Sequence, residues 1–143
     1  MSQFVPPAGF HFHDRNSAFS DLAGPYYLKA EKGSPVCLAQ LIEERHLNRV
    51  GVTHGGVLMT LADNAIGDAI INAYDQPVNS VTVSMASEFM SPARLGDWVV
   101  AETELHRRGR RLVFAECMVK VGERKIMRAS AVMSLVMPEG VSA

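Results

Sequence analysis

The chain has 143 residues, of which 48% are hydrophobic and 20% are charged. This length is typical of one domain with its own hydrophobic core, and the composition is that of an ordinary soluble globular protein. A formal net charge of −1 gives no reason to expect nucleic acid as a partner.

The expected compartment is the cytoplasm. Residues 1–9 lack the basic stretch and the long apolar run of a signal peptide. No stretch approaches the ~18 apolar residues that would span a bilayer, so we expect no membrane partner. Cys37 and Cys117 lie in apolar runs without CxxC spacing, which is typical of free, buried thiols in a reducing compartment.

Residues 1–23 are predicted to form an irregular N-terminal segment followed by a short helix. Pro and Gly interrupt the first eleven residues. Asp14 or Asn16 is the candidate cap of a helix over residues 17–22, which Gly24-Pro25 would end.

The rest of the chain alternates between strand and helix patterns. Two strands are predicted over residues 26–32 and 36–43, followed by a polar connection and a long apolar helix from Val57 to about Ala73. The hydrophobic period then changes from 3.6 to 2, which predicts four more strands, over residues 81–89, 99–105, 113–121 and 127–135. This order predicts one α+β domain over residues 1–143, an antiparallel sheet of five to six strands wrapped around one long central helix.

Two parts of a hydrolytic site lie on the long helix. His54-Gly55-Gly56 stands at its start, where exposed backbone N–H groups can bind a negative oxygen. Asp63 is a lone carboxylate among apolar residues of the same helix. An oxyanion-binding backbone and a partly desolvated acid are two parts that an acyl-transfer hydrolase needs.

The spacing of these two parts has a consequence for assembly. Eight residues separate Gly55 from Asp63, roughly 12 Å along the axis at about 1.5 Å per residue. Nine steps of about 100° place His54 and Asp63 on opposite faces. One ester carbonyl cannot contact both groups of a single chain. If they cooperate, a second copy must supply one of them, most simply through antiparallel helices about a two-fold axis, which predicts a homodimer with two shared sites.

The same residues resemble those of the hotdog-fold acyl-CoA thioesterases, in particular the phenylacetate-pathway thioesterases and the acyl-CoA thioesterase 13-like proteins. The resemblance runs from about Val36 to the C-terminus. Its specific points are Asn48, His54-Gly55-Gly56, Asp63, Thr82, Phe89-Met90-Ser91-Pro92-Ala93 and Leu95-Gly96-Asp97.

The resemblance implies a role for each residue of the motif. Asp63 would act as nucleophile or general base, and the Gly55 N–H of the other subunit would polarise the thioester carbonyl. Asn48 would lie near the carbonyl or the water, Thr82 would position the water, and His54 would orient the loop and contact the carbonyl. The implied reaction converts an aryl- or medium-chain acyl-CoA to the free acid and CoA without metal or cofactor. The implied assembly is a homodimer that pairs into a tetramer.

Further candidates would contact the acyl or CoA part of such a substrate. They are Gly56, Met59, Met85, Ser91, Pro92, Arg110, Arg111 and Arg124. The arginines belong to two basic turns that compete for the CoA phosphates, and the first turn has the alternative role of a solvated hairpin tip. The methionines have the alternative role of filling gaps in the core.

The sequence leaves several alternatives open. A hotdog dehydratase or hydratase would need a catalytic His on the central helix, which the sequence does not place there. A non-catalytic acyl-CoA-binding module would keep the fold without needing Asp63. Asn48 has the alternative role of a loop cap, and Asn64 and Asp68 are expected to make polar contacts at a helix–helix interface. His11-Phe12-His13 has no clustered Cys, Asp or Glu to complete a metal site.

Overall fold

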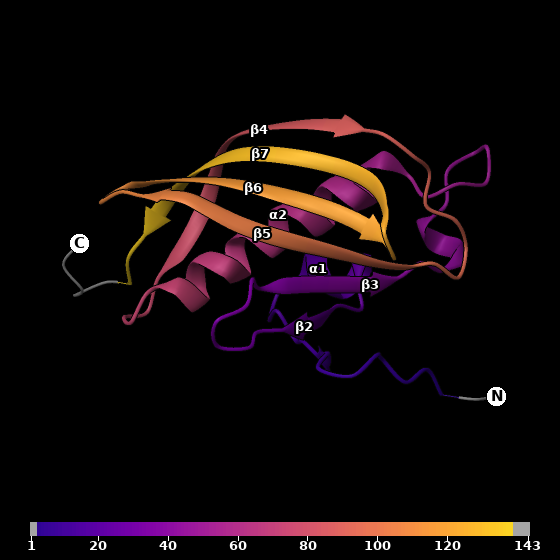
Figure 1. The fold of residues 1–143 in the computed structure, drawn as a ribbon, viewed down its shortest axis with the longest axis horizontal. Coiled ribbons are helices and arrows are strands. Elements are labelled where there is room, and N and C mark those ends of the chain that lie inside the picture. Colours follow the sequence, from indigo (N-terminus) through magenta and orange to yellow (C-terminus); the bar gives the residue numbers. More distant parts are fainter. Residues whose placement is uncertain (1–2, 139–143) are drawn as a thin grey trace.

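One long helix, α2 (Gly55–Ala73), is wrapped by a single antiparallel sheet in the computed structural model, which describes residues 3–138 (Figure 1). The sheet has seven strands in the order β1-β2-β3-β5-β6-β7-β4. Their bounds are β1 His11–Phe12, β2 Tyr27–Lys29, β3 Cys37–Leu41, β4 Asn79–Phe89, β5 Trp98–Arg108, β6 Leu112–Val121 and β7 Arg124–Val136. A short helix α1 (Ala18–Ala23) and a 3-10 turn η1 (Glu44–His46) complete the elements. The predicted antiparallel sheet around one helix is confirmed, with seven strands instead of five to six.

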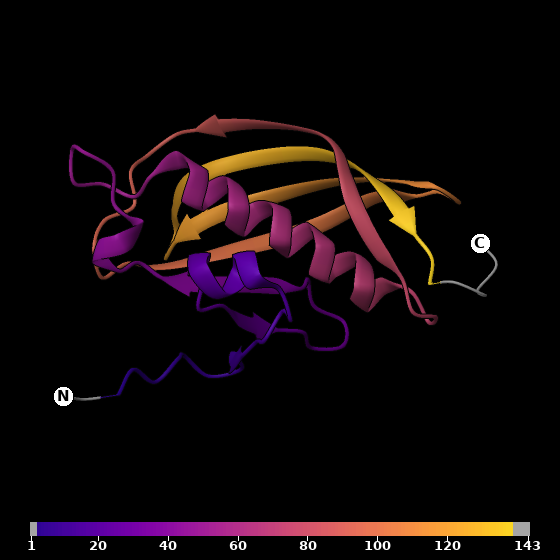
Figure 2. The same ribbon diagram turned by 180° about the vertical axis from the view of Figure 1, so that it is seen from behind.

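Small side chains on the inner face of the sheet let α2 pack closely against it. Ala101, Ala115, Ala129 and Ala131 are buried on three central strands. The helix fills the remaining space with larger side chains such as Leu61, Ile66 and Ile70, all fully buried. Large residues facing small ones produce the dense packing that a single core requires. Figure 2 shows α2 lying across the sheet with α1 beside it.

Strand β4 follows α2 in sequence but lies at the edge of the sheet, beyond β7. Only its β7 side is paired within the described residues. Val81 and Val83 are 56% and 60% exposed, and the register shifts between Thr82 and Ser84. The alternating pattern of β4 thus predicted a strand correctly, but the strand is mostly exposed in one copy of the chain. A long apolar edge of this kind is a template for pairing with another chain.

The N-terminal elements differ in detail from the prediction. Ser17, and not Asp14 or Asn16, caps α1, because its side chain accepts from the Ser20 N–H. Asp14 instead accepts from the Asn16 N–H in a local turn with Asn16 at φ 53°. The short strand β1 was not predicted because two residues carry no period.

The cysteines are both free. Cys117 is buried, and burial raises the pKa of its thiol to about 12. Cys37 is only half-buried, less than predicted, and burial raises its pKa as well. Both thiols are therefore protonated and weakly reactive near neutral pH.

No helix within residues 3–138 has the length and apolar character needed to cross a membrane.

Candidate functional site

The first turn of α2 leaves one backbone amide for an external acceptor. His54 caps the helix: its Nδ1 accepts from the Gly56 N–H at 2.8 Å, and its carbonyl accepts from the Val57 and Leu58 N–H groups at 2.9 and 3.4 Å. Within residues 3–138, the Gly55 N–H has no hydrogen-bond partner. This amide lies at the positive end of the helix dipole, where an oxyanion is stabilised.

A cavity lies beside that amide. It measures about 390 Å³ and is lined by Val52, Thr53, Gly55, Leu58, Phe89, Met90, Ser91 and Pro92. A Cβ at position 55 would lie 3.3 Å from ring carbons of Phe89, so the aromatic ring lies close against the helix start and would have to shift slightly to admit a larger residue. The structure therefore places Gly55, Ser91 and Pro92 in one cavity. The contribution of Phe89 had not been predicted.

Asp63 lies half-buried on the side of α2 that faces β4. The Thr82 hydroxyl donates to Asp63 Oδ1, so the structure brings this predicted pair together within one chain. Among the described residues no basic side chain forms an ion pair with Asp63. Within residues 3–138 the carboxylate is therefore held by a neutral hydroxyl and not by a cation.

Gly55 and Asp63 do not meet in one chain. Both lie on the continuous helix α2, eight residues or roughly 12 Å apart along its axis. The separation predicted from the sequence thus holds in the structure. The site that the motif describes is incomplete in a single copy.

Asn48 organises the loop that leads to the helix. Its Oδ1 accepts from the Val50 and Val52 N–H groups at 3.0 and 3.2 Å. The backbone closes the same turn through the Asn48 N–H to Val52 carbonyl bond at 2.8 Å, with Gly51 at φ 82°. The oxygen of the side chain is therefore used locally, as the loop-cap alternative expects, and the side-chain NH₂ group is what remains for other contacts.

Gly56, Met59 and Met85 do not line the cavity beside Gly55. Met59 is 36% exposed and lies one turn before Asp63 on α2, while Met85 is partly buried against the core. The N–H of Gly56 is already taken by His54.

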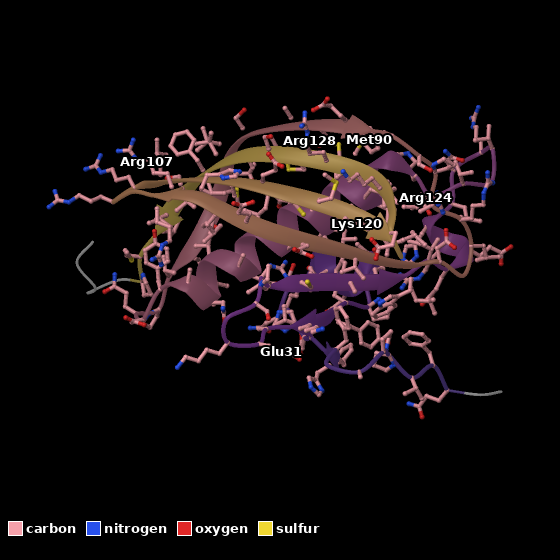
Figure 3. The ribbon with its side chains drawn as sticks, in the orientation of Figure 1. Glu31, Met90, Arg107, Lys120, Arg124 and Arg128 are labelled. Carbon is pink, nitrogen blue, oxygen red and sulfur yellow. The ribbon has the colours of Figure 1, made fainter. Side chains whose placement is uncertain are left out.

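The two basic turns lie at opposite ends of the sheet in one chain, as the labelled Arg107 and Arg124 show (Figure 3). Arg124 donates to Ser91 Oγ at 2.7 Å and to the Pro92 carbonyl at 2.5 Å, beside the cavity. Arg110 and Arg111 are exposed on the β5–β6 turn, at the end where α2 finishes. Within one chain the two turns cannot hold the same ligand.

The expected roles of Asn64 and Asp68 need correction. Both are buried on α2, and within residues 3–138 of one copy their side chains contact Arg15 of the N-terminal segment and not another helix. Arg15 lies 53 residues from Asp68 in sequence, so no local pattern signals the contact.

Within residues 3–138 no group of three or more His, Cys, Asp or Glu side chains is arranged to hold a metal ion.

Comparison with known proteins extends these observations. A family model described as "Thioesterase superfamily" matches residues 50–127. The Pseudomonas aeruginosa protein named "Putative esterase PA0474" is 36% identical over 129 residues, which cover 90% of this chain and 96% of that protein. Human acyl-coenzyme A thioesterase 13 is 33% identical over 87 residues, 61% of each chain. A hypothetical thioesterase of Streptococcus pneumoniae, solved with coenzyme A, shares the fold with a TM-score of 0.71 at 22% identity, over 78% of this chain and 88% of that one.

The loop contacts of Asn48 generate a stability prediction. Asn48→Ala removes both acceptor contacts and is expected to lower the free energy of unfolding by about 1–2 kcal/mol. Asn48→Asp keeps an oxygen at the same place and is expected to change it by less than about 0.5 kcal/mol. Urea titration of the two variants measures this, and equal losses would show that the side-chain oxygen does not hold the loop.

Proposed function

The chain belongs to the thioesterase superfamily, and we propose that this thioester hydrolase converts an acyl-CoA to the free acid and CoA at a site shared by two copies. The motif predicted the family and the hotdog fold, and both are confirmed. One observation carries the proposal: α2 holds both a free backbone amide and a carboxylate without a cationic partner among residues 3–138. The amide belongs to Gly55 and the carboxylate to Asp63.

The proposed reaction uses these groups in order. Asp63 takes a proton from water, and the water oxygen bonds to the carbonyl carbon of the thioester. Thr82, whose proton already points at Asp63, accepts a hydrogen bond from that water and so orients it. Charge develops on the carbonyl oxygen, where the Gly55 N–H of the other copy donates. The C–S bond then breaks, and the proton passes to the CoA thiolate.

General magnitudes support this division of work. One oxyanion donor typically contributes about 10²–10³ in rate, and a general base about 10²–10⁴. A thioester is already reactive, so the proposal needs no metal or organic cofactor, and CoA enters only as part of the substrate. Direct attack by the Asp63 carboxylate, which would form an anhydride, uses the same residues and is the alternative route.

The exposed surface of one copy supports the dimer. The uncovered side of α2 carries Met59, and the neighbouring strand β4 exposes Val81 and Val83. If Gly55 of one copy faces Asp63 of the other on antiparallel helices, the two-fold axis passes the residue midway between them. That residue is Met59, which then meets its own counterpart. An apolar side chain is what such a position favours.

The same geometry gives both basic turns a part in holding CoA. The C-terminal end of α2 lies ten residues past Asp63, roughly 15 Å along the axis. In the antiparallel dimer that end extends beyond the helix start of the other copy, at the end of that copy where Arg124 contacts Ser91 and Pro92. Arg110 and Arg111 of one copy and Arg124 of the other thus come to the same end of the dimer, and we assign them to the CoA phosphates. The Streptococcus pneumoniae relative solved with coenzyme A supports this class of ligand.

The finer expectations from the sequence belong to the same proposal. Met59 and Met85 line the acyl path, Asn48 and His54 hold the loop that presents Gly55, and the acyl group is aryl or medium-chain. Two dimers form a tetramer, and the protein works in the cytoplasm.

The role of Asp63 predicts a large loss of turnover. Asp63→Asn is expected to lower kcat by about 10² or more, while Thr82→Val, which removes only the hydroxyl, has a smaller effect. Thiol release from benzoyl-, phenylacetyl-, short-, medium- and long-chain CoA esters measures both. Asp21→Asn, an exposed carboxyl on the short helix α1, is the control and keeps full activity. Normal turnover by Asp63→Asn would contradict the mechanism.

Sharing of the site predicts complementation between two inactive variants. Gly55→Pro removes the N–H at the first helical position, where proline is tolerated, and His54 already has the extended ψ of 133° that precedes proline. Gly55→Ala adds the same Cβ but keeps the N–H, and is the matched control.

Asp63→Asn and Gly55→Pro are each expected to be inactive alone. After unfolding and refolding as an equal mixture, half of the dimers are mixed, and each holds one intact site, so about a quarter of the wild-type activity returns. A mixture that stays inactive, although mass spectrometry detects mixed dimers, would show that each site lies within one chain.

The helix register predicts a specific cross-link. Met59→Cys is expected to form a disulfide between copies under mild oxidation, because facing residues of two packed helices come within disulfide range. Ile71→Cys, on the same helix and 48% exposed, is the control, since the two Ile71 positions would lie roughly 36 Å apart. Burial raises the pKa of both native thiols, Cys37 and Cys117, so they react weakly, and both variants carry them equally. Non-reducing electrophoresis reads the result, and equal cross-linking of both variants would contradict the register.

A further inference from the structure

The N-terminal segment is bound to the central helix α2 through the side chain of Arg15. Arg15 Nε and Nη2 donate to the two carboxylate oxygens of Asp68 at 3.3 and 3.1 Å, and Nη1 donates to Asn64 Oδ1 at 2.6 Å. The side chains of Arg15 and Asp68 are only 16% and 6% exposed. A two-pronged contact of this kind fixes both position and charge. Arg15 also lies outside residues 50–127, the part that the family model matches.

This contact lies on the part of α2 that directly follows Asp63. Asn64 is the next residue, and Asp68 follows five residues after Asp63, roughly 7.5 Å along the axis. A Cβ at Gly67, one turn beyond Asp63, would lie 3.5 Å from Arg15 Nη2. The guanidinium therefore packs against the backbone of α2 at Gly67. Charges at this separation in a partly buried site still influence one another.

We infer that Arg15 is a positioning residue for Asp63. It fixes the helical turn that carries Asp63 and neutralises Asp68, so that the negative charge of Asp68 does not oppose ionisation of Asp63. The inference rests on the proposed function, in which Asp63 must be ionised to act. A carboxylate without a cationic partner raises the pKa of a second carboxyl group nearby. An arginine without an anionic partner lowers the pKa of such a group.

Among residues 3–138, few other titratable or charged groups surround Asp68 and Asp63. His13 Nε2 lies 3.5 Å from Asp68 Oδ2 with 28% of the side chain exposed. Asp14 lines a second cavity together with His13, Arg15 and Asp68. Burial raises the pKa of Tyr26, which keeps the phenol neutral. Strand β4 presents the neutral Thr82 to Asp63, and the inner residues of β3, β5, β6 and β7 are buried and uncharged. His13 can therefore add to the neutralisation in acid, and His13→Gln is measured alongside to separate its effect.

The test is the pH dependence of kcat/KM for acyl-CoA hydrolysis in Arg15→Gln, Asp68→Asn and the double variant. The acid limb of this profile reports ionisation of the base in the free enzyme. We expect Arg15→Gln to move the limb up by about half to one pH unit and Asp68→Asn to move it down by a similar amount. The double variant returns it to the wild-type position. Structural damage alone lowers the rate at every pH and cannot move the limb in opposite directions.

Matched controls keep the outcomes separate. Arg128→Gln removes an arginine from an exposed ion pair with Glu88 on the outer face of the sheet, and leaves the limb in place. If Arg15→Gln does not fold, Arg15→Lys, which keeps the charge, is expected to leave the limb unshifted, while Asp68→Asn still lowers it. If the acid limbs of Arg15→Gln and Asp68→Asn coincide with that of the wild type, or move in the same direction, the inference is overturned. Full activity of Asp63→Asn would instead overturn the proposed function, so the two failures are distinguishable.

Discussion

The regularity of one α-helix sets the conditions for the whole site. Gly55 and Asp63 belong to the same rigid element, and no side-chain rotation can close the roughly 12 Å between them. An acid and an amide that must act on one carbonyl therefore have to come from two copies. On the proposed function, assembly is thus a step in building the active site, and anything that separates the copies removes activity without changing the fold of either one.

The fold leaves the surface that such an assembly needs. The sheet covers most of α2, with alanines on its inner face where the helix lies closest, but the side that carries Met59 stays uncovered. Strand β4 lies at the sheet edge next to this side and exposes Val81 and Val83. Apolar residues on an unpaired edge and on an adjoining helix face form one continuous surface, and burying both at once gains more than burying either alone.

The sequence predicted those features that depend on local pattern. The period of 3.6 between Val57 and Ala73 predicted α2, and the period of 2 predicted the later strands, because burial on one face imposes these periods. The Gly55 and Asp63 spacing predicted their separation because helix geometry is fixed. The edge position of β4 was not predictable, since strand order depends on contacts far apart in sequence. The Arg15 contact with Asp68 spans 53 residues and was missed for the same reason.

Two aspartates on one helix show how environment assigns different tasks to one residue type. Asp68 is 6% exposed and accepts hydrogen bonds from two nitrogens of the Arg15 guanidinium. Its charge is therefore neutralised, and both of its oxygens have a donor. Asp63, five residues away, is half-buried, and within residues 3–138 its side-chain hydrogen bond comes from a threonine hydroxyl, which orients the carboxylate without neutralising it. A carboxylate without a cation remains available to take a proton, whereas one locked by arginine does not. The arginine that makes Asp68 structural is, on this argument, also what leaves Asp63 free to act as the base.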